Sequence, residues 1–281
     1  MRLGAHMSIA GGVDKAVLRG QEIGCQAIQV FTKSNLRWMA SPLKDETIER
    51  WYRNLEESGI APVVAHDSYL INLASPDDAL WQKSLDAFVL EMMRCDVLSI
   101  PYLVMHPGAH TGSGEKAGLR RIAQALDCAF EHVPDARVTV LLETTAGQGT
   151  SLGYRFEHLA QIMQLAAGGH RLGICFDTCH ALAAGYEIRT SEGYEETFRQ
   201  LDRIIGLERL QVFHANDSKR DLGSRVDRHE HIGQGYIGLE GFWMLLNDAR
   251  FRQRPMLLET PKGPDMQKDV ENLATLRSLM T

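Results

Sequence analysis

The chain has 281 residues, of which 44% are apolar and 23% are charged, the balance of an ordinary folded globular protein. No apolar run approaches the ~20 residues that a membrane-spanning helix needs, which excludes an integral helical membrane protein. The formal net charge of −6 excludes a basic nucleic-acid-binding protein on composition alone. That last exclusion fails if the chain binds several divalent cations, because their charge offsets the acidic residues.

The cysteines and the first residues indicate the compartment. The five cysteines are scattered through apolar segments without CxxC spacing, so reduced, buried thiols are expected. The first residues run almost directly into a strand-like segment, without the charged and apolar regions of a secretory signal. We therefore expect a cytoplasmic protein that does not associate with a membrane.

Taken in order, the chain alternates short apolar runs, which predict buried strands, with longer amphipathic stretches, which predict helices. The strands are predicted at residues 3–6, 27–31, 62–66, 102–106, 138–143, 172–176, 210–214 and 256–259. The helices are predicted at residues 13–23, 45–58, 76–98, 118–132, 156–167, 191–205, 239–247 and 266–280. Ser75 is expected to cap the third helix, with Pro76 at its first position.

Eight strand–helix units in succession predict a parallel sheet that closes into a (β/α)8, or TIM, barrel. No linker rich in Gly, Pro or Ser interrupts the alternation, so one domain spanning residues 1–281 is expected. An open doubly wound sheet is the alternative, but no GxGxxG segment follows the first strand.

The third to eighth predicted strands all end in a residue type that binds metals. These residues are His66, His106, Glu143, Asp177, His214 and Glu259. In a barrel, the carboxyl ends of the strands converge on one mouth, so these side chains should meet there. Three carboxylates in one small cavity repel one another unless cations lie between them. The sequence therefore predicts a cluster of divalent metal ions at the mouth.

Two further segments extend the predicted site. His180 lies three residues after Asp177, and the polar loop after the seventh strand contains Asp227, His229 and His231. Asp177 could instead cap a helix, with His180 as a polar residue in its first turn. Spacing does not choose between His229 and His231. Five histidines and four carboxylates can hold three ions, and zinc suits such ligands best, with manganese or iron as alternatives.

Three adjacent divalent ions suit the hydrolysis of a phosphodiester. One metal-bound hydroxide attacks in line, while the other ions hold the phosphate oxygens and neutralise the charge on the leaving oxygen. Three such ions would also cancel the formal charge of −6, so a phosphate-binding mouth is compatible with an acidic chain.

At these positions the chain resembles the endonuclease IV family, the bacterial-type apurinic/apyrimidinic (AP) endonucleases of base-excision repair. The segments similar to its signature motifs are HDSYLINLA (66–74), GICFDTCH (173–180), and HANDSK (214–219) together with DRH (227–229). GQG (147–149) and the HPG stretch that begins at His106 are similar as well. The resemblance extends from Leu3 to about Glu259, nearly the whole chain.

The resemblance implies a barrel that holds three zinc ions. It places the first ion on His66, His106 and Glu143. Glu143 is implied to bridge to a second ion, which Asp177, His214 and Glu259 also hold. The third ion is implied to bind His180, Asp227 and His229, which favours His229 over His231. With Asp177 and His180 both assigned to metals, the capping role is not needed for either residue.

The resemblance also implies a reaction and a substrate. The family cleaves the phosphodiester 5′ to an abasic site in double-stranded DNA, which leaves a 3′-hydroxyl and a 5′-deoxyribose phosphate, and it trims blocked 3′ ends. A hydroxide that bridges the first two ions is the implied nucleophile, with Glu143 as the catalytic residue that positions it.

Four residues are expected to contact DNA. Tyr69 and Leu70 resemble residues that enter the minor groove at the lesion, where they would stabilise bent DNA and an extruded nucleotide. The loop at residues 33–38 departs from the family pattern, because the usual arginine falls one residue earlier, where this chain has Leu36. Arg37 is the residue expected to reach the gap in the base stack, and Arg228 is expected to meet a backbone phosphate.

Two other functions fit parts of the pattern. A metal-dependent sugar isomerase also gathers histidines and carboxylates at strand ends, but two metals suffice there, and Asp227 and His229 would lack a purpose. Such an enzyme should also show a lysine at a strand end, and none is found. A non-catalytic damage-binding protein would not need all nine ligand positions filled. No heptads occur, so a monomer is expected.

Overall fold

The computed structural model describes residues 1–263 and 265–281. Eight parallel strands close into a barrel in the order β1, β10, β7, β6, β5, β4, β3, β2. These strands are β1 (Arg2–His6), β2 (Ala27–Phe31), β3 (Val63–His66), β4 (Tyr102–Met105), β5 (Thr139–Glu143), β6 (Leu172–Asp177), β7 (Leu210–His214) and β10 (Pro255–Leu258). The predicted (β/α)8 barrel is confirmed.

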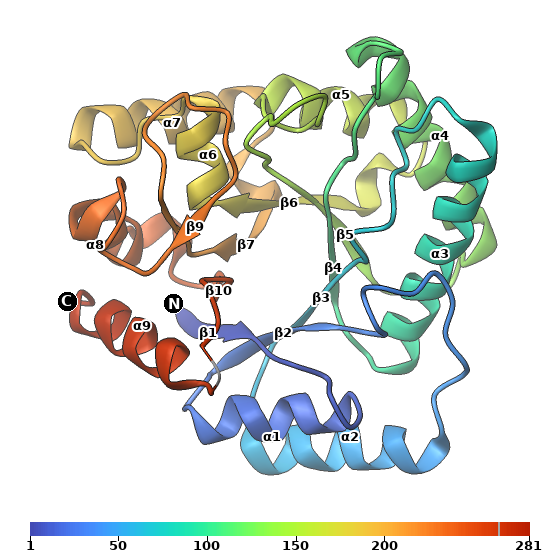
Figure 1. Ribbon diagram of the computed structural model, residues 1–281, viewed down its shortest axis with the longest axis horizontal. Helices are drawn as coiled ribbons and strands as arrows, with labels where there is room; N and C mark the ends of the chain where they lie inside the picture. The colour runs from blue at the N-terminus through green and yellow to red at the C-terminus, as the bar shows by residue number, and fades with distance from the viewer. Residues whose placement is uncertain (264) are drawn as a thin grey trace.

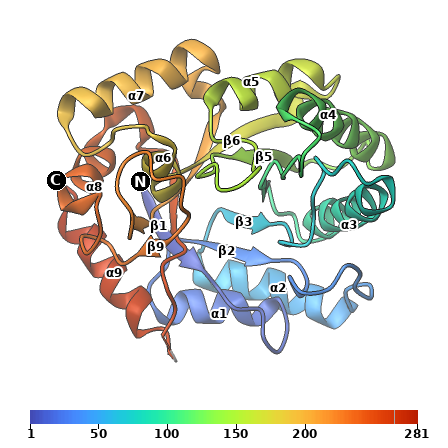
Figure 2. The same ribbon diagram turned by 45° about the horizontal axis from the view of Figure 1, so that its top comes forward.

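The helices form a ring around the barrel, seen from two directions in Figure 1 and Figure 2. They are α1 (Asp14–Glu22), α2 (Asp45–Ser58), α3 (Asp78–Val97), α4 (Glu115–His132), α5 (Phe156–Leu165), α6 (Thr178–Ala184), α7 (Ser191–Ile204), α8 (Gly238–Asn247) and α9 (Gln267–Ser278). The short helix α6 lies inside this ring, close to the strands. None of the helices in the described part of the chain is long and apolar enough to cross a membrane.

Helix α3 begins two residues later than predicted. The prediction of Ser75 as its cap, with Pro76 at the first position, is wrong. The Asp77 side chain accepts a hydrogen bond from Leu80 N at 2.8 Å, so Asp77 is the cap and the helix starts at Asp78. Ser75 Oγ accepts from Asp77 N instead, at 3.2 Å, and so fixes the turn that leads to the cap.

Side chains fill the barrel in layers, because alternate residues of a strand point to the same face. One interior layer is apolar and fully buried: Ala27, Val64, Val104, Leu141, Cys175, Val212 and Leu257. Two residues further along the chain from these, in the strands or directly after them, stand Gln29, His66, His106, Glu143, Asp177, His214 and Glu259. The apolar layer is therefore the floor beneath a polar layer at the carboxyl ends of the strands.

Strand β1 completes both layers in a different way. Its residue at the floor is Gly4, where a Cβ atom would lie 1.6 Å from the carbonyl oxygen of Ala27. Only glycine fits this close approach of two backbones. Two residues later, His6 lies at the level of the polar layer.

A long segment between β7 and α8 lies over one side of the mouth (Figure 1). It contains two short antiparallel strands, β8 (Asp217–Ser218) and β9 (His229–Glu230), where only a polar loop was predicted. The buried carboxylate of Asp217 fixes its base, because it accepts five backbone N–H groups at 2.7–3.3 Å. The donors are Ser218, Gly233, Gly235, Ile237 and Gly238.

Replacing Asp217 with alanine should destabilise this segment strongly. Each buried N–H that loses a charged acceptor costs about 1–3 kcal/mol unless water replaces it, so we expect a loss of ~3 kcal/mol or more in unfolding free energy. Urea denaturation of chelator-treated protein measures the loss without any contribution from metal. The matched control is Asp221→Ala, an exposed carboxylate of the same segment that pairs with Arg189 and should change stability by less than ~1 kcal/mol. Equal stability of the two variants would contradict the assignment.

Candidate metal centre

The polar layer, α6 and the segment after β7 bring potential metal ligands together in overlapping groups, and within each group the ligand atoms lie within 4.8 Å of one another. The three groups that match the predicted sets are His66, His106 and Glu143; Glu143, Asp177, His214 and Glu259; and His180, Asp227 and His229. A further grouping combines Asp177, Cys179 and His229. All nine residues expected as ligands therefore lie in the three matching groups.

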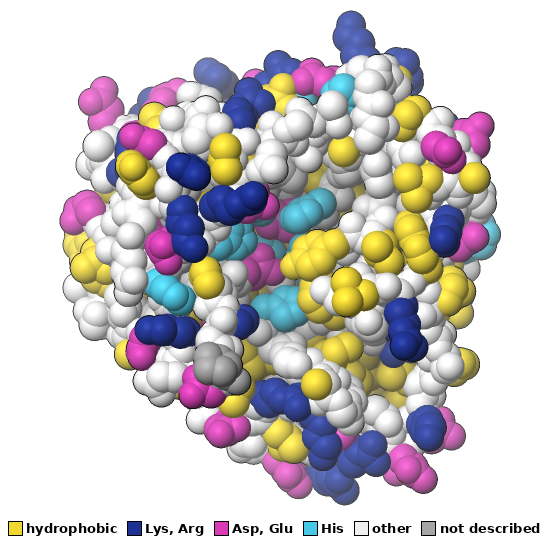
Figure 3. Space-filling view, in the orientation of Figure 1, with side chains coloured by type: hydrophobic (Ala, Val, Ile, Leu, Met, Phe, Trp, Pro, Cys, Tyr) yellow, Lys and Arg dark blue, Asp and Glu magenta, His cyan; other side chains and the backbone are white. Residues whose placement is uncertain are grey.

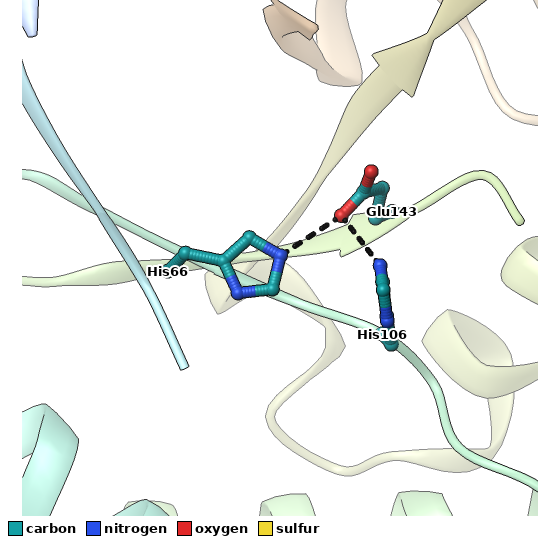
Figure 4. Close-up of side chains that lie close together, drawn as sticks. All are labelled: His66, His106 and Glu143. Carbon is teal, nitrogen blue, oxygen red and sulfur yellow. Dashed lines mark hydrogen bonds and ion pairs between the residues drawn. The ribbon is translucent and has the colours of Figure 1, made fainter. Parts of the chain in front are cut away.

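The first group gathers around one carboxylate oxygen. Glu143 Oε2 lies 3.1 Å from His66 Nε2 and 3.2 Å from His106 Nε2, and both rings point toward it (Figure 4). Glu143 and His66 are buried, whereas the side chain of His106 is 37% exposed. Two imidazoles and one carboxylate with one open side are the donor set of a catalytic zinc site.

The second group uses the other oxygen of the same glutamate. Glu143 Oε1 lies 3.0 Å from His214 Nδ1, and Glu259 Oε2 lies 3.3 Å from the same nitrogen. Asp177 Oδ2 is 3.9 Å from His214 Nδ1. Glu143 thus faces both groups, with one carboxylate oxygen toward each, as a bridging ligand requires.

The third group joins α6 to the segment after β7. Asp227 Oδ2 lies 3.2 Å from His180 Nε2, and Asp227 Oδ1 lies 3.4 Å from His229 Nε2. The two imidazole nitrogens are 3.3 Å apart. His231 turns away and its Nδ1 lies 3.1 Å from Asn272 Nδ2, so the structure brings together the residues that the resemblance favoured.

Asp177 caps α6, so the sequence interpretation that set the capping role aside is wrong. Its Oδ1 accepts a hydrogen bond from His180 N at 2.8 Å and caps α6. Its Oδ2 accepts from Asn216 Nδ2 at 2.6 Å and lies 3.8 Å from His229 Nε2. One carboxylate has two oxygens, so a helix cap and a metal ligand are compatible in a single residue.

Backbone carbonyls set the orientation of three of the histidines. His66 Nδ1 donates to Asp67 O at 2.8 Å, His180 Nδ1 to Thr144 O at 2.9 Å, and His229 Nδ1 to Glu259 O at 3.0 Å. A carbonyl only accepts, so each Nδ1 carries a proton and each Nε2 faces the cluster, where it can bind a second proton or a metal ion. This arrangement is typical of metal-bound histidines.

The charged groups of the cluster shift one another's pKa. Burial alone would raise the pKa of Glu143, yet the charges of His214 and His106 hold it well below its usual range. Burial alone would lower the pKa of His66, but the hydrogen bond and the charge of Glu143 raise it to about 10. Burial opposes the charged form of His180 too, but the nearby carboxylates raise its pKa well above the usual value. In the absence of cations, protons on the histidines neutralise the carboxylates, and metal ions can replace those protons.

The third group depends on packing between two loops. Asp227 N donates to Gln148 Oε1 at 3.1 Å. Two residues earlier, the guanidinium of Arg225 lies 3.9 Å from the ring centroid of Tyr154, whose hydroxyl donates to Glu115 Oε1 at 2.6 Å. The segment after β7 is therefore held against the segment after β5.

Of the four residues expected to contact DNA, three are exposed, and Tyr69 lies beside the first ligand group. Tyr69 is 61% exposed and its ring centroid lies 6.3 Å from that of His106, while Leu70 beside it is half-buried. Arg37 and Arg228 are exposed, and Leu36, next to Arg37, is 79% exposed. Figure 3 looks into the mouth, where histidine and carboxylate side chains line a hollow, with basic side chains over one rim and apolar side chains over another.

Two cavities adjoin the cluster. One, of about 300 Å³, is lined in part by Tyr69, His106, His180 and Asp227. The other, of about 950 Å³, meets the mouth at His6 and Phe31. The first includes three residues of the candidate metal groups and therefore opens directly onto the candidate metal centre.

Sequence reasoning missed two amides of this site, Gln29 and Asn216. Asn216 links Asp177 to Glu259, because its Oδ1 accepts from Glu259 N at 2.8 Å while its amide nitrogen donates to Asp177. Gln29 stands two residues after the apolar floor residue Ala27, the same offset as the metal-ligand types on the other strands. Attention to this offset, rather than to ligand types alone, would have found Gln29.

A closed parallel barrel with imidazole and carboxylate groups clustered at the carboxyl ends of its strands defines the class of a TIM-barrel enzyme with a candidate metal centre. The family model described as a xylose isomerase-like TIM barrel matches residues 17–279. Probable endonuclease 4 of Chloroflexus aurantiacus is 57% identical over 279 residues, 99% of this chain and 98% of the relative. The chain therefore belongs to the endonuclease IV family, and the predicted family is confirmed.

Solved structures agree with this assignment. The crystal structure of endonuclease IV from Thermus thermophilus is 38% identical, with a TM-score of 0.88 over 99% of this chain and 98% of that one. D-psicose 3-epimerase from Clostridium cellulolyticum has a TM-score of 0.71 over 100% and 99% of the two chains. At 13% identity, that second likeness shows the fold alone.

The raised histidine pKa values predict opposite pH responses with and without metal. In metal-free protein, the pKa of His66 is raised to about 10, so its contribution to stability is complete below the unfolded-state pKa of ~6.5 and is lost as pH rises through about 10. The melting temperature of chelator-treated protein should therefore fall between pH 7 and pH 10. Metal-loaded protein already has deprotonated histidines, so it should lose stability on acidification instead. Identical pH profiles for the two forms would contradict this account.

Proposed function

We propose that the protein is a zinc-dependent AP endonuclease that hydrolyses the DNA phosphodiester 5′ to an abasic site and trims blocked 3′ ends in base-excision repair. The observation that carries this proposal is the placement of three ligand groups in one barrel mouth, two of them sharing Glu143. The products are a 3′-hydroxyl and a 5′-deoxyribose phosphate. We further propose that the protein acts as a monomer in the cytoplasm on double-stranded DNA.

The three groups fit three zinc ions. His66, His106 and Glu143 would hold the first ion, and His180, Asp227 and His229 the third. The second would bind Glu143, Asp177, His214 and Glu259. Zinc ions bound there would supply an activated water and would neutralise charge on the phosphate and on the leaving oxygen. Manganese or iron could replace zinc, because imidazole and carboxylate suit all three metals.

The chain's own contribution is preorganisation around Glu143. Each oxygen of this buried carboxylate faces a different ligand group, at 3.1 Å from His66 and 3.0 Å from His214. The carboxylate therefore lies between the first two ligand groups, where it would position the attacking water. Because the strands fix the positions of all these groups, little reorganisation accompanies the reaction.

The exposed residues at the rim suit a distorted duplex. Tyr69 projects from the segment just after β3, beside the first ligand group, and Leu70 follows it. An aromatic and an aliphatic side chain at the mouth can enter a base step and stabilise an extruded abasic nucleotide. Arg37 would reach the gap in the base stack of the DNA, and Arg228 would contact a backbone phosphate.

A sugar-converting enzyme is the second candidate, because the epimerase fold is shared. The third ligand group counts against it. Asp227 and His229 come from the segment after β7 and meet His180 with ligand atoms 3.2–3.4 Å apart, which a two-metal sugar site would not need. Assaying ketose epimerisation and DNA nicking with the same zinc-loaded preparation separates the two functions.

Nicking of a duplex with one abasic site tests the proposed reaction. The zinc-loaded protein should cut the strand 5′ to the site, and Glu143→Ala should lower the rate at least ~10³-fold. That loss corresponds to about 4 kcal/mol of lost charge stabilisation at ~1.4 kcal/mol per tenfold. A denaturing gel with end-labelled strands measures both the rate and the 3′ product.

The matched control is His231→Ala. This histidine lies two residues after His229 but faces Asn272, so its removal should leave nicking unchanged. Cutting by Glu143→Ala at the unaltered rate would refute the assigned mechanism. No metal-dependent nicking by the unaltered protein would refute the proposed function.

Tyr69→Ala should weaken recognition of the lesion without changing the metal centre. Stacking of an aromatic side chain on bases contributes about 1–3 kcal/mol, so binding to an abasic duplex should weaken roughly 5- to 150-fold. Zinc content should stay the same, because Tyr69 belongs to none of the ligand groups. Fluorescence anisotropy with abasic and intact duplexes measures the difference. Tyr52→Ala, which removes a 41% exposed tyrosine on α2, is the control and should bind like the unaltered protein.

A further inference from the structure

Gln29 stands in the same layer as the proposed metal ligands, although its side chain is not a metal-ligand type. It belongs to β2 and lies two residues after Ala27, a member of the apolar floor. Its side chain is completely buried at the barrel mouth. A buried amide costs free energy unless all its groups are hydrogen-bonded, so its contacts indicate what it does.

Three side chains of the site contact this amide. Gln29 Oε1 lies 2.7 Å from His214 Nε2. Gln29 Nε2 donates to Glu259 Oε1 at 2.5 Å and lies 2.9 Å from His6 Nδ1. The amide thus links two proposed ligands of the second ion and one histidine outside the ligand groups.

The carboxylate of Glu259 decides which way the amide points. An ionised carboxylate only accepts hydrogen bonds, so the NH2 group of Gln29 must face Glu259. The amide oxygen then faces His214 Nε2 and can only accept. His214 therefore carries a proton on Nε2, and Nδ1, 3.0 Å from Glu143 and 3.3 Å from Glu259, is the nitrogen left to bind an ion.

This orientation is opposite to that of the other fixed histidines. His66, His180 and His229 each donate from Nδ1 to a backbone carbonyl and present Nε2 to the cluster. Backbone carbonyls cannot be removed by a change of sequence. The ring of His214 is oriented by the side chain of Gln29 instead of a backbone carbonyl. Its orientation therefore depends on a residue that can be replaced.

We propose that Gln29 is a positioning residue, which holds His214 with Nδ1 toward the second ion and orients Glu259 at the same time. This inference rests on the proposed metal-dependent function and deepens it. In other metal sites, removing a residue that hydrogen-bonds a metal-bound histidine typically lowers metal affinity 10- to 100-fold. The ion bound to His214 should therefore be the one most sensitive to Gln29.

The test is zinc retention by Gln29→Met, which keeps the side-chain length but removes both hydrogen-bonding groups. After dialysis against graded chelator, the zinc-to-protein ratio should fall by one ion at a roughly 10- to 100-fold lower chelator concentration than in the unaltered protein. The control is Val30→Ala, the next residue of β2, which packs toward the helices rather than the mouth. It should lower the melting temperature without changing zinc retention.

A second measurement needs no variant. In zinc-loaded protein with ¹⁵N-labelled histidine, the ring proton of His214 should be on Nε2, and those of His66, His180 and His229 on Nδ1. Zinc retention by Gln29→Met equal to that of the unaltered protein, or a ring proton on His214 Nδ1, would overturn the inference. Both results would leave the proposed function intact, whereas an unaltered protein that binds no zinc would overturn the function itself.

Discussion

The contact of the Glu143 carboxylate with the surrounding imidazoles is the interaction on which the site depends. Burial opposes the ionised form of Glu143, and Asp177 and Glu259 nearby add further negative charge. Such a group of carboxylates is stable only with compensating positive charge, from protonated histidines or from metal ions. The same electrostatic requirement accounts for the gathering of histidines and carboxylates in one place at the mouth.

The barrel provides this arrangement through the alternation of its strands. Residues two apart on a strand point to the same side, so a mouth residue lies above each apolar floor residue. His66 lies above Val64 in this way, and Glu143 above Leu141. Strands fix the first two ligand groups rigidly. The third group differs, because Asp227 and His229 reach the cluster only through the long segment that Asp217 holds at its base and Gln148 at its tip. The barrel therefore positions the first two ligand groups, whereas the third group depends on the fold of a single long loop.

Most of the fold could be predicted from local sequence patterns. Eight apolar runs separated by amphipathic helices predict the correct barrel, and metal-ligand types at strand ends predict side chains that do meet at its mouth. The errors lie where two local signals compete. Ser75 and Asp77 are both good caps, and only the hydrogen bond to Leu80 N decides between them. The sequence interpretation assigns Asp177 to a metal alone, although its second oxygen caps α6.

By itself the sequence determined the barrel, the set of nine candidate ligands and the family, because period, spacing and motif are properties of the chain in order. Only the tertiary structure decided how these residues meet. It showed that Glu143 faces two groups at once, that His231 turns to Asn272, and that Gln29 lies between His214 and Glu259. These relations join residues up to 230 positions apart, such as Gln29 and Glu259. Closure of the sheet sets such contacts, and no local pattern of a single strand contains that information.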